Sequence, residues 1–165
     1  MGRGRTERYV VTMTDHLEVS RTIAASPEAV YDAISDVTRM GEWSPECVKC
    51  EWLDGATAAA VGAKFEGTNQ NNGNEWVIQN EVTAADRGAR FAFDCSARDF
   101  HFASWAYEFE STDDGGCVVT EIWDDYRPEE IRNKPSAISG VTDRAEFNRQ
   151  SMATTLERLA AAVEG

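Results

Sequence analysis

The chain has 165 residues and a mass of 18.3 kDa, which is the size of a single domain. Its 16 Lys and Arg stand against 29 Asp and Glu, and the resulting net charge of −13 repels the phosphates of nucleic acids, which are excluded as partners. Because 42% of the residues are hydrophobic, the chain can bury a core, and a disordered protein is excluded.

The first residues are basic but lack the apolar stretch of a signal peptide. We therefore expect residues 1–14 to be a disordered extension, with Met13 as an alternative start, and residues 15–165 to form one domain. No stretch approaches the roughly 20 apolar residues that cross a bilayer, so no membrane insertion is expected. The four cysteines form no dense framework, which predicts a cytoplasmic protein with reduced thiols.

A strand followed by short helices is predicted at the start of this domain. Apolar and polar residues alternate from 16 to 25, which is typical of a half-buried strand. Ser26 then provides a helix cap, and Pro27 suits the first helical position. Gly41 and Pro45 end this helical region, which we expect to hold two short helices.

The middle of the chain has the period of two that indicates strands. Six more strands are predicted, at 47–53, 62–70, 75–84, 89–97, 101–111 and 116–126. Their short connections are rich in Asp, Asn and Gly, so consecutive strands should pair as an antiparallel meander. Residues 127–140 form a predicted loop, and an amphipathic helix is expected over 141–163.

This order of elements predicts an α+β fold, in which a curved antiparallel sheet of six to seven strands wraps around a long C-terminal helix. A single helix cannot fill all the space inside such a sheet. An internal cavity is therefore expected.

Several short segments give the sequence a family likeness. They are Ile23-Ala-Ala-Ser-Pro-Glu-Ala-Val30-Tyr31, Trp43-Ser44-Pro45-Glu46, Phe65-Glu-Gly67-Thr-Asn69 and Trp105-Ala-Tyr107-Glu-Phe109. In this order and spacing, the chain from 16 to 163 resembles the START-like, Bet v 1-like (SRPBCC) superfamily, in its polyketide cyclase/dehydrase and lipid-transport branch. The resemblance implies the helix-grip fold and a cavity for a hydrophobic ligand. It implies no reaction, because the superfamily contains enzymes, carriers and sensors.

The more apolar face of each strand should point toward the long helix. With the inward face of that helix, it supplies the predicted ligand-binding residues Phe65, Asn69, Trp76, Asn80, Phe91, Phe93, Trp105, Tyr107, Glu121, Asn148 and Met152. We expect the cavity to measure roughly 300–1,000 Å³, the usual range for small-molecule sites, and to open near residues 127–140.

The last strand has apolar residues on both faces. We favour the phase that turns Glu121 and Trp123 inward, because Thr120 and Asp124 suit solvent better. In the first strand, Arg21 shares the inward phase, and the family's sheet places the first and last strands side by side. A buried pair of Arg21 with Glu121 is therefore one expectation, and a strand end or bulge that leaves both in water is the other.

Cyclase or dehydratase chemistry would need a base and hydrogen-bond donors for the developing enolate. The catalytic candidates are Glu121 as the base and Arg21 and Tyr107 as donors. No nucleophile motif or phosphate-binding loop accompanies them, and no cofactor is expected. The sequence leaves open whether the protein is an enzyme.

Cys47 and Cys50 have a spacing that also occurs in zinc and redox sites. Zinc would need two further ligands, but the chain has only two histidines, His16 and His101, and no second cysteine pair. A thioredoxin-like pair would lie at the start of a helix, whereas this pair lies within a predicted strand. We therefore expect no metal and two ordinary reduced cysteines, one facing inward and one outward.

The leading hypothesis is binding, for transport or sensing, of a hydrophobic, ring-containing small molecule or lipid. The first alternative is an enzyme of polyketide or aromatic metabolism, and the second is a protein-interaction module. Self-association into a homodimer also stays open, because Phe147 falls opposite the apolar stripe of its own helix.

Overall fold

A computed structural model describes residues 15–165 of the protein. The predicted disorder of residues 1–14 and the alternative start at Met13 lie outside the described residues. The described chain opens with strand β1 (His16–Ile23), followed by helix α2 (Pro27–Ser35) and a 3₁₀ helix η1 (Val37–Glu42). Ser26 caps α2 as expected, since its hydroxyl accepts a hydrogen bond from the backbone N–H of Ala29.

The sheet has seven strands, and every neighbouring pair is antiparallel. After β1 come β2 (Cys47–Trp52), β3 (Lys64–Asn71), β4 (Asn74–Asp86), β5 (Arg90–Ala97), β6 (Phe100–Ser111) and β7 (Cys117–Asp125). Their order across the sheet is β1-β7-β6-β5-β4-β3-β2, so β1 and β2 form its two edges. The meander and the pairing of the first strand with the last are confirmed.

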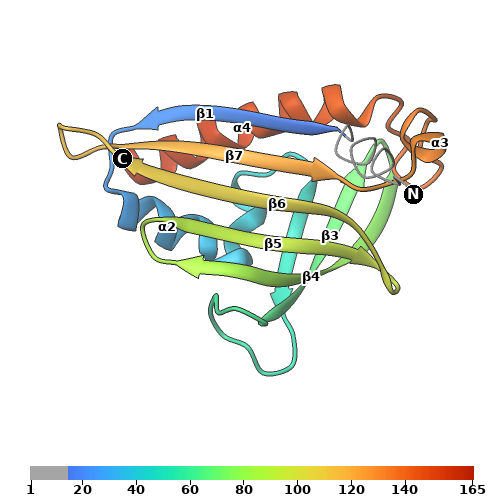
Figure 1. Ribbon diagram of the computed structural model, residues 1–165, viewed down its shortest axis with the longest axis horizontal. Coiled ribbons are helices and arrows are strands. Elements are labelled where there is room, and N and C mark those ends of the chain that lie inside the picture. The colour runs from blue at the N-terminus through green and yellow to red at the C-terminus, as the bar shows by residue number, and fades with distance from the viewer. Residues whose placement is uncertain (1–14) are drawn as a thin grey trace, which may run out of the picture.

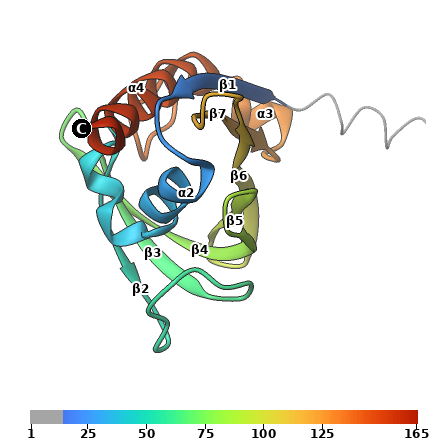
Figure 2. The same cartoon turned by 90° about the vertical axis from the view of Figure 1, so that its left-hand side faces the viewer.

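The long helix α4 (Arg144–Glu164) lies across the open side of the curved sheet, beside β1 (Figures 1 and 2). A short helix, α3 (Glu129–Arg132), falls within the segment predicted as a loop. Figure 2 shows the sheet curving around α2, with α4 spanning the opening between its two edges. This is the predicted helix-grip architecture.

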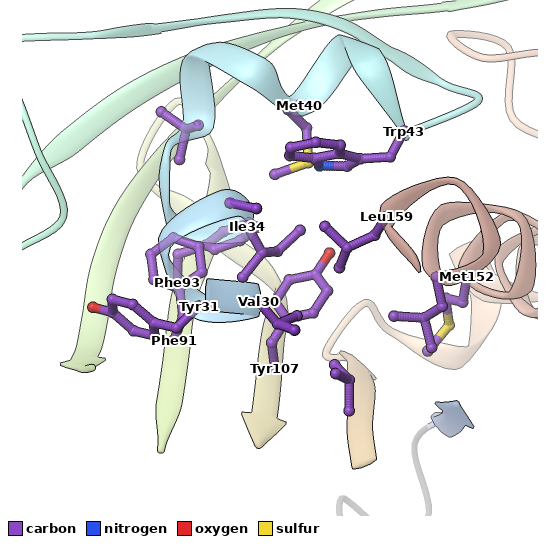
Figure 3. Close-up of a cluster of buried hydrophobic side chains, with 14 of the residues drawn as sticks. Val30, Tyr31, Ile34, Met40, Trp43, Phe91, Phe93, Tyr107, Met152 and Leu159 are labelled. Atoms are coloured by element: carbon purple, nitrogen blue, oxygen red, sulfur yellow. The ribbon is translucent and has the colours of Figure 1, made fainter. Parts of the chain in front are cut away.

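Helix α2 fills one end of the hollow. Val30 and Ile34 are fully buried there, and Figure 3 shows them facing Leu159 of α4. On the same helix, the Tyr31 ring packs edge-on against Phe91, at 6.4 Å between ring centroids, and against Phe109, at 5.9 Å. This end of the sheet is therefore closed by packed side chains.

Within residues 15–165, no helix is both long enough and apolar enough to cross a membrane.

Candidate functional site

A cavity of about 110 Å³ lies between the concave face of the sheet and the N-terminal half of α4. Most of the predicted ligand-binding residues line it: Phe65, Asn69, Asn80, Phe93, Trp105, Tyr107, Glu121 and Asn148. The alternation along the strands thus brings them to one face, as expected. Their role in binding stays a prediction.

Three predicted residues, Trp76, Phe91 and Met152, do not line the cavity. Phe91 is fully buried against Tyr31 of α2, so it belongs to the packed end of the hollow. Met152 is likewise buried in the core cluster (Figure 3). Trp76 has the inward phase, but it lies near the start of β4 and is only half-buried.

The helix presents two rows of side chains to the sheet. The polar residues Asn148, Ser151 and Thr155 line the cavity at positions i, i+3 and i+7. The neighbouring row contains Met152, Leu156 and Leu159 and packs into the core. The sequence analysis placed Asn148 and Met152 on one inward face, whereas the structure puts them in different rows. Cavity-lining residues that it missed include Ser151 and Thr155 of α4 and Met40 of η1.

The cavity volume was predicted wrongly, since about 110 Å³ is well below the expected range. The difference has a physical cause, because α2 and Phe91 occupy space that was assigned to ligand. For comparison, an engineered apolar cavity of about 150 Å³ binds benzene. The present cavity is smaller than that one, so a ligand that it encloses has at most about one ring.

The segment before β2 lines the cavity through Ser44 and Glu46. Arg144, at the start of α4, links the helix to this segment, since its Nη1 lies 2.9 Å from both carboxylate oxygens of Glu46. Its Nη2 donates to the hydroxyl of Ser139 at 2.9 Å. We expected the opening near residues 127–140, but none of these residues lines the cavity.

Arg144 also covers Phe147, with its guanidinium carbon 5.1 Å from the ring centroid. Phe147 is half-buried. The Phe147 ring, which was the reason to expect self-association, is thus partly covered by Arg144 of the same chain. A homodimer stays a prediction.

Glu121 is the buried acid of the cavity, with 2% of its surface exposed. One carboxyl oxygen, Oε1, accepts a hydrogen bond from the Tyr107 hydroxyl at 2.9 Å. The other, Oε2, is buried and has no hydrogen-bond partner among the described residues. The predicted inward phase of β7 is confirmed, because Glu121 and Trp123 are both buried.

Burial raises the pKa of Glu121 to about 8, although the hydrogen bond from Tyr107 acts in the opposite direction. The carboxyl group is therefore mostly neutral at pH 7. Since Oε1 accepts from Tyr107, the carboxyl proton belongs on Oε2, where it can be donated to a ligand. Burial also raises the pKa of Tyr107, and the nearby carboxyl adds to this shift, so the phenol stays protonated.

The expected pair of Arg21 with Glu121 is wrong. Arg21 is exposed and lies opposite Val119, whereas Glu121 lies opposite Val19. Because β1 is an edge strand, the long arginine side chain can extend around the edge into water. Arg21 is therefore excluded as a donor in the cavity, and of the catalytic candidates only Glu121 and Tyr107 meet there.

The expectation that Cys47 and Cys50 face opposite sides of the sheet is also wrong. The register of β2 with β3 shifts between Cys47 and Lys49, which is a β-bulge. In a regular strand, residues three positions apart point to opposite faces, but the extra residue of the bulge brings Cys47 and Cys50 to the same face. Both thiols therefore line the cavity. No group of three or more metal-ligating side chains is arranged to hold an ion within residues 15–165.

Two buried amides, Asn69 and Asn80, make only long contacts with backbone carbonyls. Asn69 Nδ2 lies 3.5 Å from the carbonyl of Gly67, and Asn80 Nδ2 lies 3.3 Å from that of Ile78. Bonds of this length are weak, so both amides keep hydrogen-bonding capacity for a ligand. The cavity thus combines aromatic walls with a neutral acid, a phenol and two amides.

The described residues thus form a helix-grip fold around a small cavity with aromatic walls. Residues 14–164 match the family described as Polyketide cyclase / dehydrase and lipid transport. The chain belongs to this family. No curated protein matches the sequence.

One solved structure agrees with this family, and two others share the fold. The Polyketide_cyc-like protein Cgl2372 from Corynebacterium glutamicum is 32% identical, with 90% of this chain and 82% of that chain covered and a TM-score of 0.50. Ginseng major latex-like protein 151 from Panax ginseng is 12% identical, with 93% and 99% covered and a TM-score of 0.69. The di-domain ARO/CYC StfQ from the steffimycin biosynthetic pathway is 11% identical, with 97% and 53% covered and a TM-score of 0.70. The last two likenesses concern the fold alone.

Proposed function

We propose that the protein binds a small, largely apolar, ring-containing molecule in this cavity, as a carrier or sensor. The observation that carries the proposal is the buried Oε2 of Glu121, which has no partner in the described chain although its residue lines the cavity. A buried polar atom without a partner costs about 1–3 kcal/mol. A ligand atom that accepts this hydrogen bond would remove that cost.

The cavity walls indicate the chemical class of the ligand. Phe65, Phe93 and Trp105 offer aromatic surfaces for a flat ring. The neutral carboxyl of Glu121 would donate to an acceptor oxygen, such as a carbonyl. The ligand that fits best is therefore one ring carrying a carbonyl or a similar acceptor.

A second candidate function is catalysis of cyclisation or dehydration, which the family description includes. The observation that favours it is the hydrogen bond between Glu121 and Tyr107 inside the cavity. A neutral carboxyl group at pH 7 would serve as a general acid, protonating a leaving hydroxyl group, rather than as the base first expected. In that case Glu121→Gln would abolish turnover while the fold stays intact.

The binding proposal predicts a preference between two matched probes, acetophenone and ethylbenzene. They have similar shapes, but only acetophenone carries a carbonyl. Wild-type protein at pH 6.5 should bind acetophenone roughly fivefold more tightly, which corresponds to one net hydrogen bond. The preference should disappear as the pH rises through about 8, because ionised Glu121 has no proton to donate. Isothermal titration calorimetry measures both affinities.

Two variants of Glu121 separate the effect of its hydrogen-bond donor from the effect of its charge. Glu121→Gln keeps an N–H donor and cannot ionise, so its preference for acetophenone should persist at every pH. Glu121→Leu has no donor and should bind both probes alike. Equal affinity of the wild-type protein for the two probes at pH 6.5 would contradict the role of Glu121.

A further inference from the structure

Cys47 and Cys50 lie against each other in the cavity wall. Their Sγ atoms are 3.3 Å apart, and both thiols are free. The facing residue on β3 is Gly67, and a Cβ built there would lie 3.5 Å from Cys50 Sγ and 3.6 Å from Cys47 Sγ. Because this position has no side chain, nothing comes between the two sulfurs. The bulge in β2 therefore creates a thiol pair that a regular strand would have separated.

The two thiols differ in environment. Cys47 is half-buried, whereas Cys50 is 5% exposed. The hydrogen bond from the Cys50 thiol lowers the pKa of Cys47. The same bond and burial raise the pKa of Cys50. Accessible cysteines with a lowered pKa beside a second, resolving thiol are typical of redox-sensitive sites.

We propose that Cys47 and Cys50 form a reversible redox site in the cavity wall, which closes to a disulfide when a low-molecular-weight disulfide reaches Cys47. A disulfide has an S–S length of about 2.05 Å, so the sulfurs must approach by roughly 1 Å. The pair lies on β2, which is an edge strand with one neighbour, and the bulge already interrupts its pairing. A small movement of the β2 backbone at this point would therefore disturb only its hydrogen bonds with β3.

The reaction is a thiol–disulfide exchange in two steps. The Cys47 thiolate attacks one sulfur of the small disulfide, forms a mixed disulfide and releases one thiolate. Cys50 gives up its proton to that released thiolate and attacks Cys47 Sγ, which expels the second thiolate, and this takes up the proton lost by Cys47. The protein loses two hydrogens, and the small disulfide is reduced to two thiols.

The other two cysteines serve as internal controls. Cys95 and Cys117 are buried, and burial raises the pKa of each thiol. Neither has a hydrogen bond to another cysteine in the described chain. They should therefore stay reduced under conditions that oxidise the pair.

The test uses the full chain and hydroxyethyl disulfide, a small neutral oxidant. Intact mass spectrometry should show the loss of two hydrogens, peptide mapping should place the bond between Cys47 and Cys50, and dithiothreitol should reverse it. Cys50→Ser should instead retain one hydroxyethylthio group on Cys47. Cys47→Ser should react on the order of tenfold more slowly, because the buried Cys50 carries little thiolate.

The control variant Cys117→Ala should form the disulfide like the wild-type protein, and circular dichroism checks that each variant is folded. The proposal is overturned if folded wild-type protein keeps both thiols free at excess oxidant. It is also overturned if Cys47 accumulates as a stable mixed disulfide although Cys50 is present. Neither outcome depends on whether the cavity binds a ring-containing ligand.

Discussion

Leu156→Ala is expected to lower the free energy of unfolding by about 2–5 kcal/mol. Leu156 is 1% exposed and lies in the core row of α4, beside the fully buried Leu159. Removing three side-chain carbons there loses their burial and leaves a cavity that a close-packed interior refills only in part. Urea denaturation followed by far-ultraviolet circular dichroism measures the change.

Arg158→Ala is the matched control for this substitution. Arg158 lies on the same helix and is exposed, and arginine and alanine have similar helix propensities. Its effect should stay within about 0.5 kcal/mol. A loss of less than about 1 kcal/mol in Leu156→Ala would contradict the packing of α4 across the open side of the sheet.

The architecture was predictable because it depends on periodicity. The alternation of β7, with Val119, Glu121 and Trp123 buried, places a whole face inward, and a slip of one residue would reverse it. The helix cap at Ser26 and the turns between strands are likewise local signals. A sheet with one long amphipathic helix then has few arrangements that bury both apolar faces.

Local departures from periodicity were not predictable. No Gly, Pro or other turn residue in β2 marks the bulge after Cys47. The bulge nevertheless changes the face of the sheet to which Cys47 points. Similarly, Arg21 has the inward phase, and only its place on an edge strand explains why it is exposed. Both errors concern the edges of the sheet, where one neighbouring strand is missing and alternation constrains side chains least.

The sequence also could not predict which inward-facing residues pack in the core and which line the cavity. Phe91 and Phe93 share one face of β5, but Phe91 packs against α2 and only Phe93 lines the cavity. The difference depends on how far α2 and α4 reach along the strands. That reach is set by tertiary packing, which periodicity does not describe.

Glu121→Gln is expected to stabilise the protein at pH 7 by about 3 kcal/mol. The pKa of Glu121 is about 8 in the folded protein because the carboxyl group is buried, against an ordinary value of 4.5. At pH 7 the unfolded chain therefore gains the hydration of an ionised carboxylate, whereas the folded protein holds a neutral acid. The glutamine amide matches the shape of the neutral acid and can still accept the hydrogen bond from Tyr107.

The same substitution should change how stability depends on pH. The contribution of Glu121 to the free energy of unfolding is fully present below about pH 4.5 and is lost progressively as the pH rises toward 8. Above about pH 8 the stability no longer changes with the ionisation of Glu121. Between pH 5 and pH 8 the wild-type protein should thus lose about 3.5 kcal/mol of stability relative to Glu121→Gln, as measured by urea denaturation at each pH. Glu81→Gln, at an exposed position on β4, is the control and should follow the wild-type profile. Parallel profiles for wild type and Glu121→Gln would mean that Glu121 is ionised in the folded protein, and a neutral donor in the cavity would then be ruled out.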